Sequence, residues 1–158
     1  MGEVVAREWL KTELEGIRAR GAKVVFTNGC FDLLHRGHVE YLKEAREFGD
    51  LLIVGLNSDG SVRRLKGKGR PYVPEEDRAA VLSALECVDY VCVFDEDTPL
   101  RLIQELRPAV LVKGKDYEPA DVVGAEEVKG WGGEVRLVDL VPHRSTTEMA
   151  ERIARARG

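Results

Sequence analysis

The sequence lacks several features that would place the chain in particular classes of protein. No apolar run approaches the roughly 18 residues that a membrane-spanning helix needs. The N-terminal stretch MGEVVAREWLKTELEG has neither a basic start nor a continuous apolar segment, so we expect no secretory signal. Cysteine is scarce, and Cys30, Cys87 and Cys92 form no C-x-x-C pair. We therefore expect unpaired thiols packed as small core residues in the reducing cytoplasm.

The common nucleotide and hydrolase signatures are also missing. There is no G-x-x-x-x-G-K-[ST] loop, no G-x-G-x-x-G fingerprint and no G-x-S-x-G elbow. The net charge of −4, from 24 basic and 28 acidic residues, does not favour a partner such as nucleic acid or a membrane. A chain that is 44% hydrophobic and 33% charged is typical of a globular protein and not of a disordered one.

What the sequence does contain is a regular alternation of two patterns. Its 158 residues fit one domain. Apolar runs typical of buried strands occur at 23–26, 51–56, 89–94, 109–113 and 134–140. Helical spacing or helix-start signals occur at 6–20, 39–48, 74–88, 98–107 and 120–130 and from Ser145 onward, while 57–74 is predicted to be a long polar loop. The alternation predicts an α/β domain: a Rossmann-like, doubly wound, five-stranded parallel sheet with helices on both faces.

The densest group of reactive side chains follows the first of these strands. Residues 27–38 read TNGCFDLLHRGH and lead into a helical pattern. His35 and His38 are three residues apart, so near a helix start they lie on one side, and Gly37 lets a ligand approach the backbone. The helix N-terminus adds amide donors and partial positive charge. Imidazoles beside such donors suit a phosphate chain whose charge grows in a transition state.

Two other interpretations of this turn stay open at the level of sequence. Asp32, His35 and His38 are the ligand types of a metal site with two histidines and one carboxylate, although no second acid or cysteine cluster accompanies them. The histidines could instead be structural. Two of the chain's three histidines nevertheless fall in this one glycine-bearing turn.

Basic residues are concentrated after the second strand. A loop of this length inside a domain is usually functional, so we expect a lid whose cations close over phosphates. The alternative is an ordinary solvated surface. A nucleic-acid patch is disfavoured because Tyr72 is the only aromatic residue nearby. The run contains no acid and consists of Arg63, Arg64, Lys66, Lys68 and Arg70.

Polar groups also follow the two later strands at the same predicted edge of the sheet. Residues 113–117 read KGKDY after the fourth strand, and residues 144–147 read RSTT after the fifth. The hydroxyls of the second group suit a helix N-cap, so this is a second candidate anion-binding helix start. Ligands of doubly wound sheets bind at this edge, where the strand order reverses.

These motifs resemble a known family. The segment FDLLHRGH, residues 31–38, is similar to the H-x-G-H signature of the cytidylyltransferase-like nucleotidyltransferases, and Arg144 to Thr147 is similar to their C-terminal R-[x]-S-T-T element. The resemblance runs from about Val24 to Ile153. It implies a single nucleotidyltransferase domain over residues 1–158, with an N-terminal helix in 1–22 and a catalytic core in 23–153.

One branch of that family matches best. TNGCFD at 27–32, RLKG at 64–67, Arg70-Pro71 and VKGKDY at 112–117 look most like the D-glycero-β-D-manno-heptose 1-phosphate adenylyltransferases, which make ADP-heptose for lipopolysaccharide. The resemblance implies transfer of AMP from ATP to a sugar 1-phosphate, Mg²⁺ bound through nucleotide phosphates, and a homodimer. The heptose enzyme is often fused to a sugar kinase domain, and this chain is expected to be a stand-alone version.

The resemblance also implies roles for individual residues. It implies no protein metal ligands. The expected catalytic residues are His35, His38, Lys66, Lys68 and Arg144. The expected nucleotide-binding residues are Thr27, Asn28, Gly29, Cys30, Phe31, Asp32, Gly37, Lys113, Gly114, Asp116, Tyr117, Ser145, Thr146 and Thr147. The expected acceptor-binding residues are Asn57, Asp59, Arg64 and Arg70.

Two alternatives remain beside this hypothesis. Glycerol-3-phosphate cytidylyltransferases are the nearest rival branch, but they carry a longer R-T-E-G-I-S-T-T element, whereas Ser145 follows Arg144 directly here. This favours the heptose branch without deciding between ATP and CTP. The other alternative is a nucleotide-sensing module of the same fold without catalysis, because fold alone does not establish activity.

Overall fold

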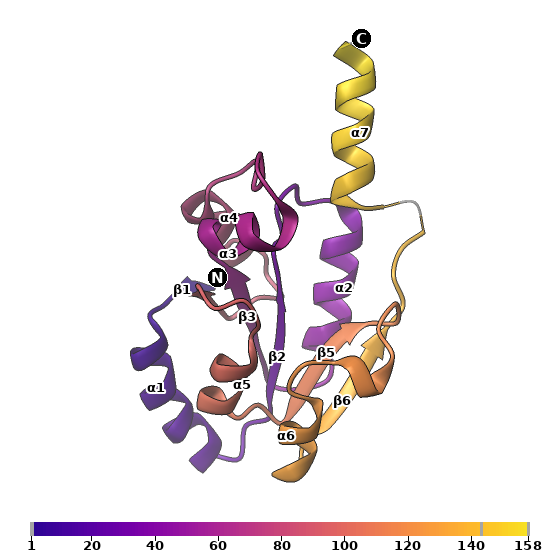
Figure 1. Cartoon of the computed structure of the whole chain (residues 1–158). Helices are drawn as coiled ribbons and strands as arrows, with labels where there is room; N and C mark the ends of the chain where they lie inside the picture. The colour runs from indigo at the N-terminus through magenta and orange to yellow at the C-terminus, as the bar shows by residue number, and fades with distance from the viewer. Residues whose placement is uncertain (1, 143, 158) are drawn as a thin grey trace.

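The computed structural model of the chain describes residues 2–142 and 144–157, which contain a parallel sheet in the order β1-β4-β3-β2-β5-β6 (Figure 1). The strands are β1 Glu3–Val4, β2 Val24–Gly29, β3 Leu51–Asn57, β4 Tyr90–Phe94, β5 Val110–Gly114 and β6 Glu134–Val138. The helices are α1 Arg7–Ala19, α2 Arg36–Arg46, α3 Asp59–Lys66, α4 Glu75–Ser83, α5 Leu100–Leu106, α6 Ala125–Gly130 and α7 Thr146–Arg157, with a 3₁₀ turn η1 at Pro119–Asp121.

The sheet has one strand more than the sequence predicts. The added strand, β1, pairs in parallel with β4 at the sheet edge, with Glu3 opposite Tyr90. It has two residues, both exposed, so it carries neither an apolar run nor an alternation that the sequence could reveal. The prediction of five strands was therefore wrong, and the segment 1–22 contains this strand as well as α1.

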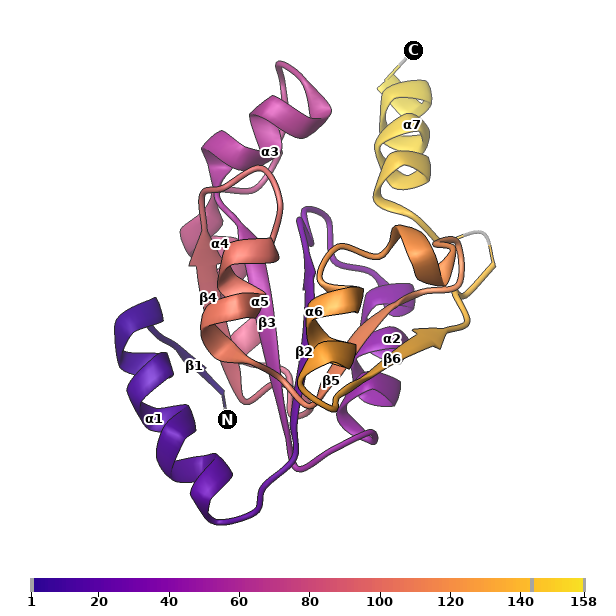
Figure 2. The same cartoon turned by 60° about the horizontal axis from the view of Figure 1, so that its bottom comes forward.

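Helices cover both faces of the sheet, as predicted. Alternate residues of a strand face opposite sides, so Phe26 packs with one core and Val25 with the other. The first core joins the sheet to Leu14 of α1 and Leu102 of α5, and also to α6. The second joins it to Leu42 of α2 and to α4. Figure 2 shows α5 and α6 together on one side of the strands.

The segment 57–74 is only partly a loop. Its first half forms α3, where the Ser58 side chain caps the helix by accepting a hydrogen bond from the Ser61 amide at 3.0 Å. The last turn of α3 is basic, and these positive charges stabilise the helix because they lie near the negative end of its dipole. The prediction of a continuous loop was therefore wrong for residues 59–66, and the loop proper is 67–74.

The cysteines are core residues only in part. Cys92 is buried, whereas Cys30 and Cys87 are half-buried, and all three are free thiols. The expectation that all three pack as core residues holds for Cys92, which belongs to the first core, and in part for Cys87, which packs against the second; Cys30 belongs to neither core.

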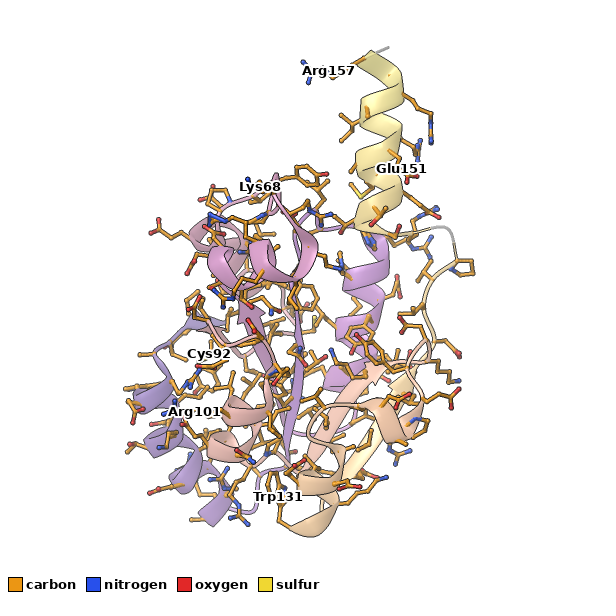
Figure 3. All side chains as sticks on the ribbon, in the orientation of Figure 1. Lys68, Cys92, Arg101, Trp131, Glu151 and Arg157 are labelled. Atoms are coloured by element: carbon orange, nitrogen blue, oxygen red, sulfur yellow. The ribbon has the colours of Figure 1, made fainter. Side chains whose placement is uncertain are left out.

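The last helix, α7, stands away from the rest of the molecule (Figures 1 and 2). It begins beside α2 and contains no buried residue. Figure 3 shows Glu151 and Arg157 on this projecting helix, beyond the body of the molecule. None of the helices in the described ranges has the length and apolar character that a membrane span requires.

Candidate active site

A cleft of about 670 Å³ opens at the carboxyl ends of β2 and β5. The chain runs from β2 outward to β3 and β4 on one side, then crosses to β5 and β6 on the other. The cleft therefore lies where the strand order reverses, as the sequence predicts. The predicted residues that line it are Asn28, Gly29, Cys30, Phe31, Asp32, His35, Gly37, His38, Asn57, Lys66, Arg70, Lys113, Gly114, Asp116, Tyr117, Arg144, Ser145, Thr146 and Thr147.

The two histidines fix each other at the start of α2. His35 is the N-cap, and its Nδ1 accepts a hydrogen bond from the Gly37 amide at 3.0 Å. His38 Nδ1 accepts one from the His35 amide at 3.2 Å, which forms a reciprocal capping box. The rings stack with centroids 3.9 Å apart. Because both Nδ1 atoms are acceptors, each neutral ring carries its proton on Nε2, which is left to donate to a ligand.

Burial keeps these rings neutral at physiological pH. Burial, followed by the neighbouring His35, lowers the pKa of His38 from 6.5 to about 4. Burial, followed by the positive charge of Arg144, also lowers the pKa of His35. Desolvation disfavours the charged form of an imidazole. The pair therefore offers two N–H donors to a phosphate chain without adding a full positive charge.

The turn before α2 has a fixed and unusual backbone. Phe31 has a φ of 45°, in the left-handed region that residues with a side chain rarely adopt. Its ring lies 5.2 Å from that of His38. A Cβ on Gly29 would stand 2.9 Å from the Phe31 ring, so a side chain there would have to displace that ring. Strain of this kind persists where the surroundings determine the conformation, as they do at many active sites.

Thr27, expected among the nucleotide-binding residues, lies beneath the cleft and does not line it. It is fully buried, and its hydroxyl donates to the Val112 carbonyl at 2.9 Å. Its Oγ1 is also 2.8 Å from the Tyr41 hydroxyl, which donates to the same carbonyl. Thr27 therefore joins β2 to β5 below the site and to α2 beside it.

Asp32 holds the loop 67–74 against the turn. Its carboxylate is 1% exposed and accepts from Arg70 Nε at 2.9 Å. It also accepts from the amides of Tyr72 and Val73, each at 2.9 Å. Although Asp32 and Arg70 both line the cleft, they bind each other. No group of three or more histidine, cysteine or acidic side chains in the described residues is arranged to hold a metal, so the Asp32–His35–His38 metal hypothesis gains no support.

The remaining basic residues separate into two groups. Lys66 lines the cleft, whereas Arg64 and Lys68 do not. Arg64 Nε instead donates to Asp97 at 2.8 Å, and Figure 3 shows Lys68 at the outer end of the molecule beyond α3. Asp59, expected at the acceptor site, is 2.7 Å from Arg78 Nη2 and borders a smaller cleft of about 310 Å³. The structure thus brings Lys66 to the cleft and leaves Arg64, Lys68 and the acidic Asp59 outside it.

The opposite wall of the cleft comes from the end of β5. Lys113 Nζ donates to the Asn28 carbonyl at 3.3 Å and lies 5.2 Å from the centre of the Tyr117 ring. Burial lowers the pKa of Lys113 to about 8. The side-chain Oδ1 of Asn28 is buried and has no hydrogen-bond partner within the described residues. A buried acceptor of this kind is satisfied when a ligand donates to it.

The start of α7 closes the cleft on a third side. The Ser145 hydroxyl accepts from the Glu148 amide at 3.0 Å and retains its own hydrogen for donation. The Thr146 hydroxyl donates to the Leu33 carbonyl at 3.2 Å, which ties α7 to the turn that precedes α2. Two helix N-termini, those of α2 and α7, therefore border one volume.

The sequence analysis missed Arg78, a buried arginine on α4. Its side chain is 0% exposed, and its guanidinium donates to the carbonyls of Cys30, Asn57 and Val73, each at 2.8 Å. A signal was present, because Arg78 has the helical spacing of the buried residues Ala79 and Leu82. An arginine on the apolar face of a helix needs buried acceptors.

A parallel α/β sheet with two helix N-termini and a neutral histidine pair around one cleft defines a doubly wound α/β domain whose cleft suits an anionic ligand. The sequence model of the cytidylyltransferase-like family matches residues 26–154, and the chain belongs to this family of nucleotidyltransferases.

Curated relatives share a large part of their sequence with the chain. It is 61% identical over 145 residues to the "Bifunctional protein HldE" of Geobacter metallireducens, covering 92% of this chain and 30% of that protein. It is 63% identical over 147 residues to the protein of the same name from Syntrophotalea carbinolica, covering 93% and 30%. The chain therefore spans about 30% of the length of these relatives.

A solved structure shares the fold. It is titled "Crystal structure of the lipopolysaccharide core biosynthesis protein from Thermoplasma volcanium GSS1" and is 28% identical, with a TM-score of 0.65. The match covers 78% of this chain and all of that one.

Proposed function

We propose that the chain transfers AMP from ATP to a sugar 1-phosphate, heptose 1-phosphate, and releases pyrophosphate. The observation that carries this proposal is the cleft, in which His35, His38, Lys66 and the start of α7 face one volume. Membership of the cytidylyltransferase-like family supports the reaction class. The resemblance of the motifs to the heptose 1-phosphate adenylyltransferase branch supports the choice of donor and acceptor.

The proposed reaction is a direct in-line displacement. An oxygen of the sugar phosphate forms a bond to the α-phosphorus of ATP, and the bond from that phosphorus to the bridging oxygen of pyrophosphate breaks. The electron pair of that bond leaves with pyrophosphate. No covalent enzyme intermediate is needed, so catalysis consists of positioning and charge stabilisation.

The lining residues divide between the parts of the nucleotide. Nε2–H of His35 and His38 would donate to phosphate oxygens, and Lys66 would meet the charge that moves to the leaving pyrophosphate. Arg144 and the Ser145 hydroxyl would bind the β- and γ-phosphates at the start of α7. The backbone amides of Cys30 and Phe31 would bind the α-phosphate. Asp116 and Tyr117 would contact the ribose or the base, and Asn57 would contact the acceptor.

Mg²⁺ is proposed to enter the site with the nucleotide. The Asp32 carboxylate is engaged by Arg70 and two loop amides, so it does not present a free ligand set for a resident ion. Phosphate oxygens would then hold the ion. When bound there, Mg²⁺ neutralises part of the phosphate charge.

Pyrophosphate release tests the proposal. The purified chain is mixed with ATP or CTP, each with heptose 1-phosphate or glycerol 3-phosphate. We expect release above background with ATP and heptose 1-phosphate, and the ADP-sugar as the second product by mass spectrometry. Release with CTP and glycerol 3-phosphate alone would assign the chain to the cytidylyltransferase branch. Nucleotide binding without turnover in every pair would contradict the proposal and favour a nucleotide-sensing module.

We also propose that the protein acts as a homodimer in the cytoplasm, where its thiols stay reduced. Support for the dimer comes from α7, whose Met149, Ala150, Ile153 and Ala154 share one side of the helix. Ile153 is 55% exposed there. A second copy would cover this apolar stripe and hold the start of α7 at the cleft.

Replacing Ile153 with glutamate is expected to convert the dimer to a monomer, because it places a charge in the apolar stripe. Light scattering after size-exclusion chromatography measures the mass. Arg155→Ser, on the opposite side of α7, is the matched control and should remain dimeric. A monomeric wild-type chain, or a dimeric Ile153→Glu variant, would refute this interface.

A further inference from the structure

Arg78 contacts three separate segments that the active site requires in one relative placement. Its Nη1 donates to the Cys30 carbonyl in the turn before α2 and to the Asn57 carbonyl at the end of β3. Its Nε donates to the Val73 carbonyl in the loop 67–74. These segments lie 48, 21 and 5 residues away in sequence. One guanidinium therefore holds together the turn before α2 that carries the histidines (the histidine turn), the central strand β3 and the loop 67–74 (the basic loop).

Asp32 makes a second contact to the same loop, at the same residue, Val73. Arg78 reaches a carbonyl of Val73, while Asp32, in the histidine turn, accepts from the Val73 amide at 2.9 Å. The backbone amide and the backbone carbonyl of Val73 are thus each hydrogen-bonded to a buried charged side chain, an arrangement that we call the clasp. Asp32 is 1% exposed and Arg78 0% exposed, so little water competes for either contact.

Arg78 contacts the chain on both sides of Lys66 in sequence, at Asp59 and at Val73. Lys66 ends α3, which the loop 67–74 follows, and it faces the cleft together with His38. Asp59, at the start of α3, also pairs with Arg78, with Asp59 Oδ1 2.7 Å from Nη2. Arg78 therefore contacts both the start of α3 and the loop beyond its end, without lining the cleft itself.

We propose that Arg78 is a positioning residue for the transfer reaction: it locks the basic loop to the histidine turn so that Lys66 and the histidine pair address the same phosphates. The inference rests on the function proposed above. Only arginine suits this position, because its planar fork presents five donors in fixed directions, whereas a lysine ammonium has three donors around a single point.

Arg78→Lys is the test, because it keeps the charge and breaks the fork. We expect kcat for pyrophosphate release to fall by about 10²-fold, since a displacement of about 1 Å at a reacting group costs this much. The KM for ATP should change much less. We also expect trypsin to cut at Lys66-Gly67 and Lys68-Gly69 about tenfold faster, because proteolysis follows local opening of the chain. Fragment masses identify these cuts.

A matched control separates positioning from loss of stability. Leu14→Ala leaves a cavity in the other core of the sheet, under α1, and lowers the Tm without touching the loop. Both variants are assayed at a temperature at which circular dichroism shows them folded. Leu14→Ala should keep wild-type kcat and wild-type cleavage at the two loop bonds. Equal losses in the two variants, or a folded Arg78→Lys variant with unchanged kcat and cleavage, would overturn the proposal.

One further variant keeps the outcome decisive. Where Arg78→Lys does not fold, Asp32→Asn breaks the same clasp from the other side and should speed the same two cuts without any substrate present. Unchanged cleavage there also overturns the proposal. The protease assay needs no turnover, so it still decides the role of Arg78 when the wild-type chain proves inactive with every substrate pair, an outcome that refutes only the proposed function.

Discussion

Replacing His38 with alanine is expected to lower kcat by roughly 10²–10³-fold, the range for loss of one donor that stabilises charge in a transition state. His38 is the more deeply buried of the two rings, and it packs behind Phe31 and against His35. Its Nδ1 is already bound to the His35 amide, so Nε2–H is the group that it can donate to a phosphate; alanine removes this donor together with the capping contact. Steady-state pyrophosphate release with ATP and heptose 1-phosphate measures the effect.

His38→Gln is the informative companion variant. A glutamine amide can supply an N–H donor without an imidazole, so it should retain more activity than alanine. A His38→Ala variant with near wild-type kcat would remove this residue from the mechanism. Equal losses in both variants would mean that the imidazole does more than donate a hydrogen bond.

The pH dependence follows from the low pKa of His38. The ring is neutral above its folded pKa of about 4, so wild-type kcat should not change through titration of His38 between about pH 6 and about pH 8. An ordinary imidazolium acting as the donor would instead lose kcat as the pH rises across that interval. The same shift in pKa makes the free energy of unfolding depend on pH, because the unfolded chain binds the proton of His38 more tightly than the folded chain does. The stability that the neutral ring contributes is fully present above pH 6.5 and is lost as the pH falls toward about 4.

The parts of the fold that the sequence could predict are those with a strong local pattern. Central strands of a parallel sheet are buried on both faces, so 51–56 appears as a continuous apolar run and forms β3 almost as predicted. The edge strand β1 has no such pattern, because its two residues are exposed and are fixed only by pairing with β4. Segment 59–66 is too polar to show a helical stripe, and its helix depends on the Ser58 cap.

The candidate site follows the same division. The histidine turn and the start of α7 could be predicted, because helix-start chemistry is local in sequence. The partners of Asp32 and Arg78 could not, because each charge is satisfied by backbone groups that are close only after folding. The basic run likewise gives no indication of which cations face the cleft, since α3 places Lys66 inward and pairs Arg64 with Asp97.

Lys66→Met is expected to lower kcat/KM for ATP by about 10²-fold, because it removes a charge-assisted contact to the departing phosphates while keeping the length of the side chain. Lys66 lines the cleft from the end of α3, where the clasped loop begins. Burial raises the pKa of the Cys30 thiol, and the positive charge of the nearby Lys66 offsets part of that rise. The side chain is therefore close to the turn that carries the histidines.

Lys68→Met is the contrasting variant, and it distinguishes the structure from the sequence. The basic run alone makes Lys66 and Lys68 equivalent, whereas the structure places only Lys66 at the cleft. The loss in kcat/KM should therefore be about tenfold or less for Lys68→Met, against about 10²-fold for Lys66→Met, because a surface charge is screened by solvent and salt. Equal losses would mean that the loop 67–74 closes further over bound nucleotide and brings both ammonium groups to the phosphates. A larger loss for Lys68→Met would contradict the placement of Lys66 as the cation that meets the leaving pyrophosphate.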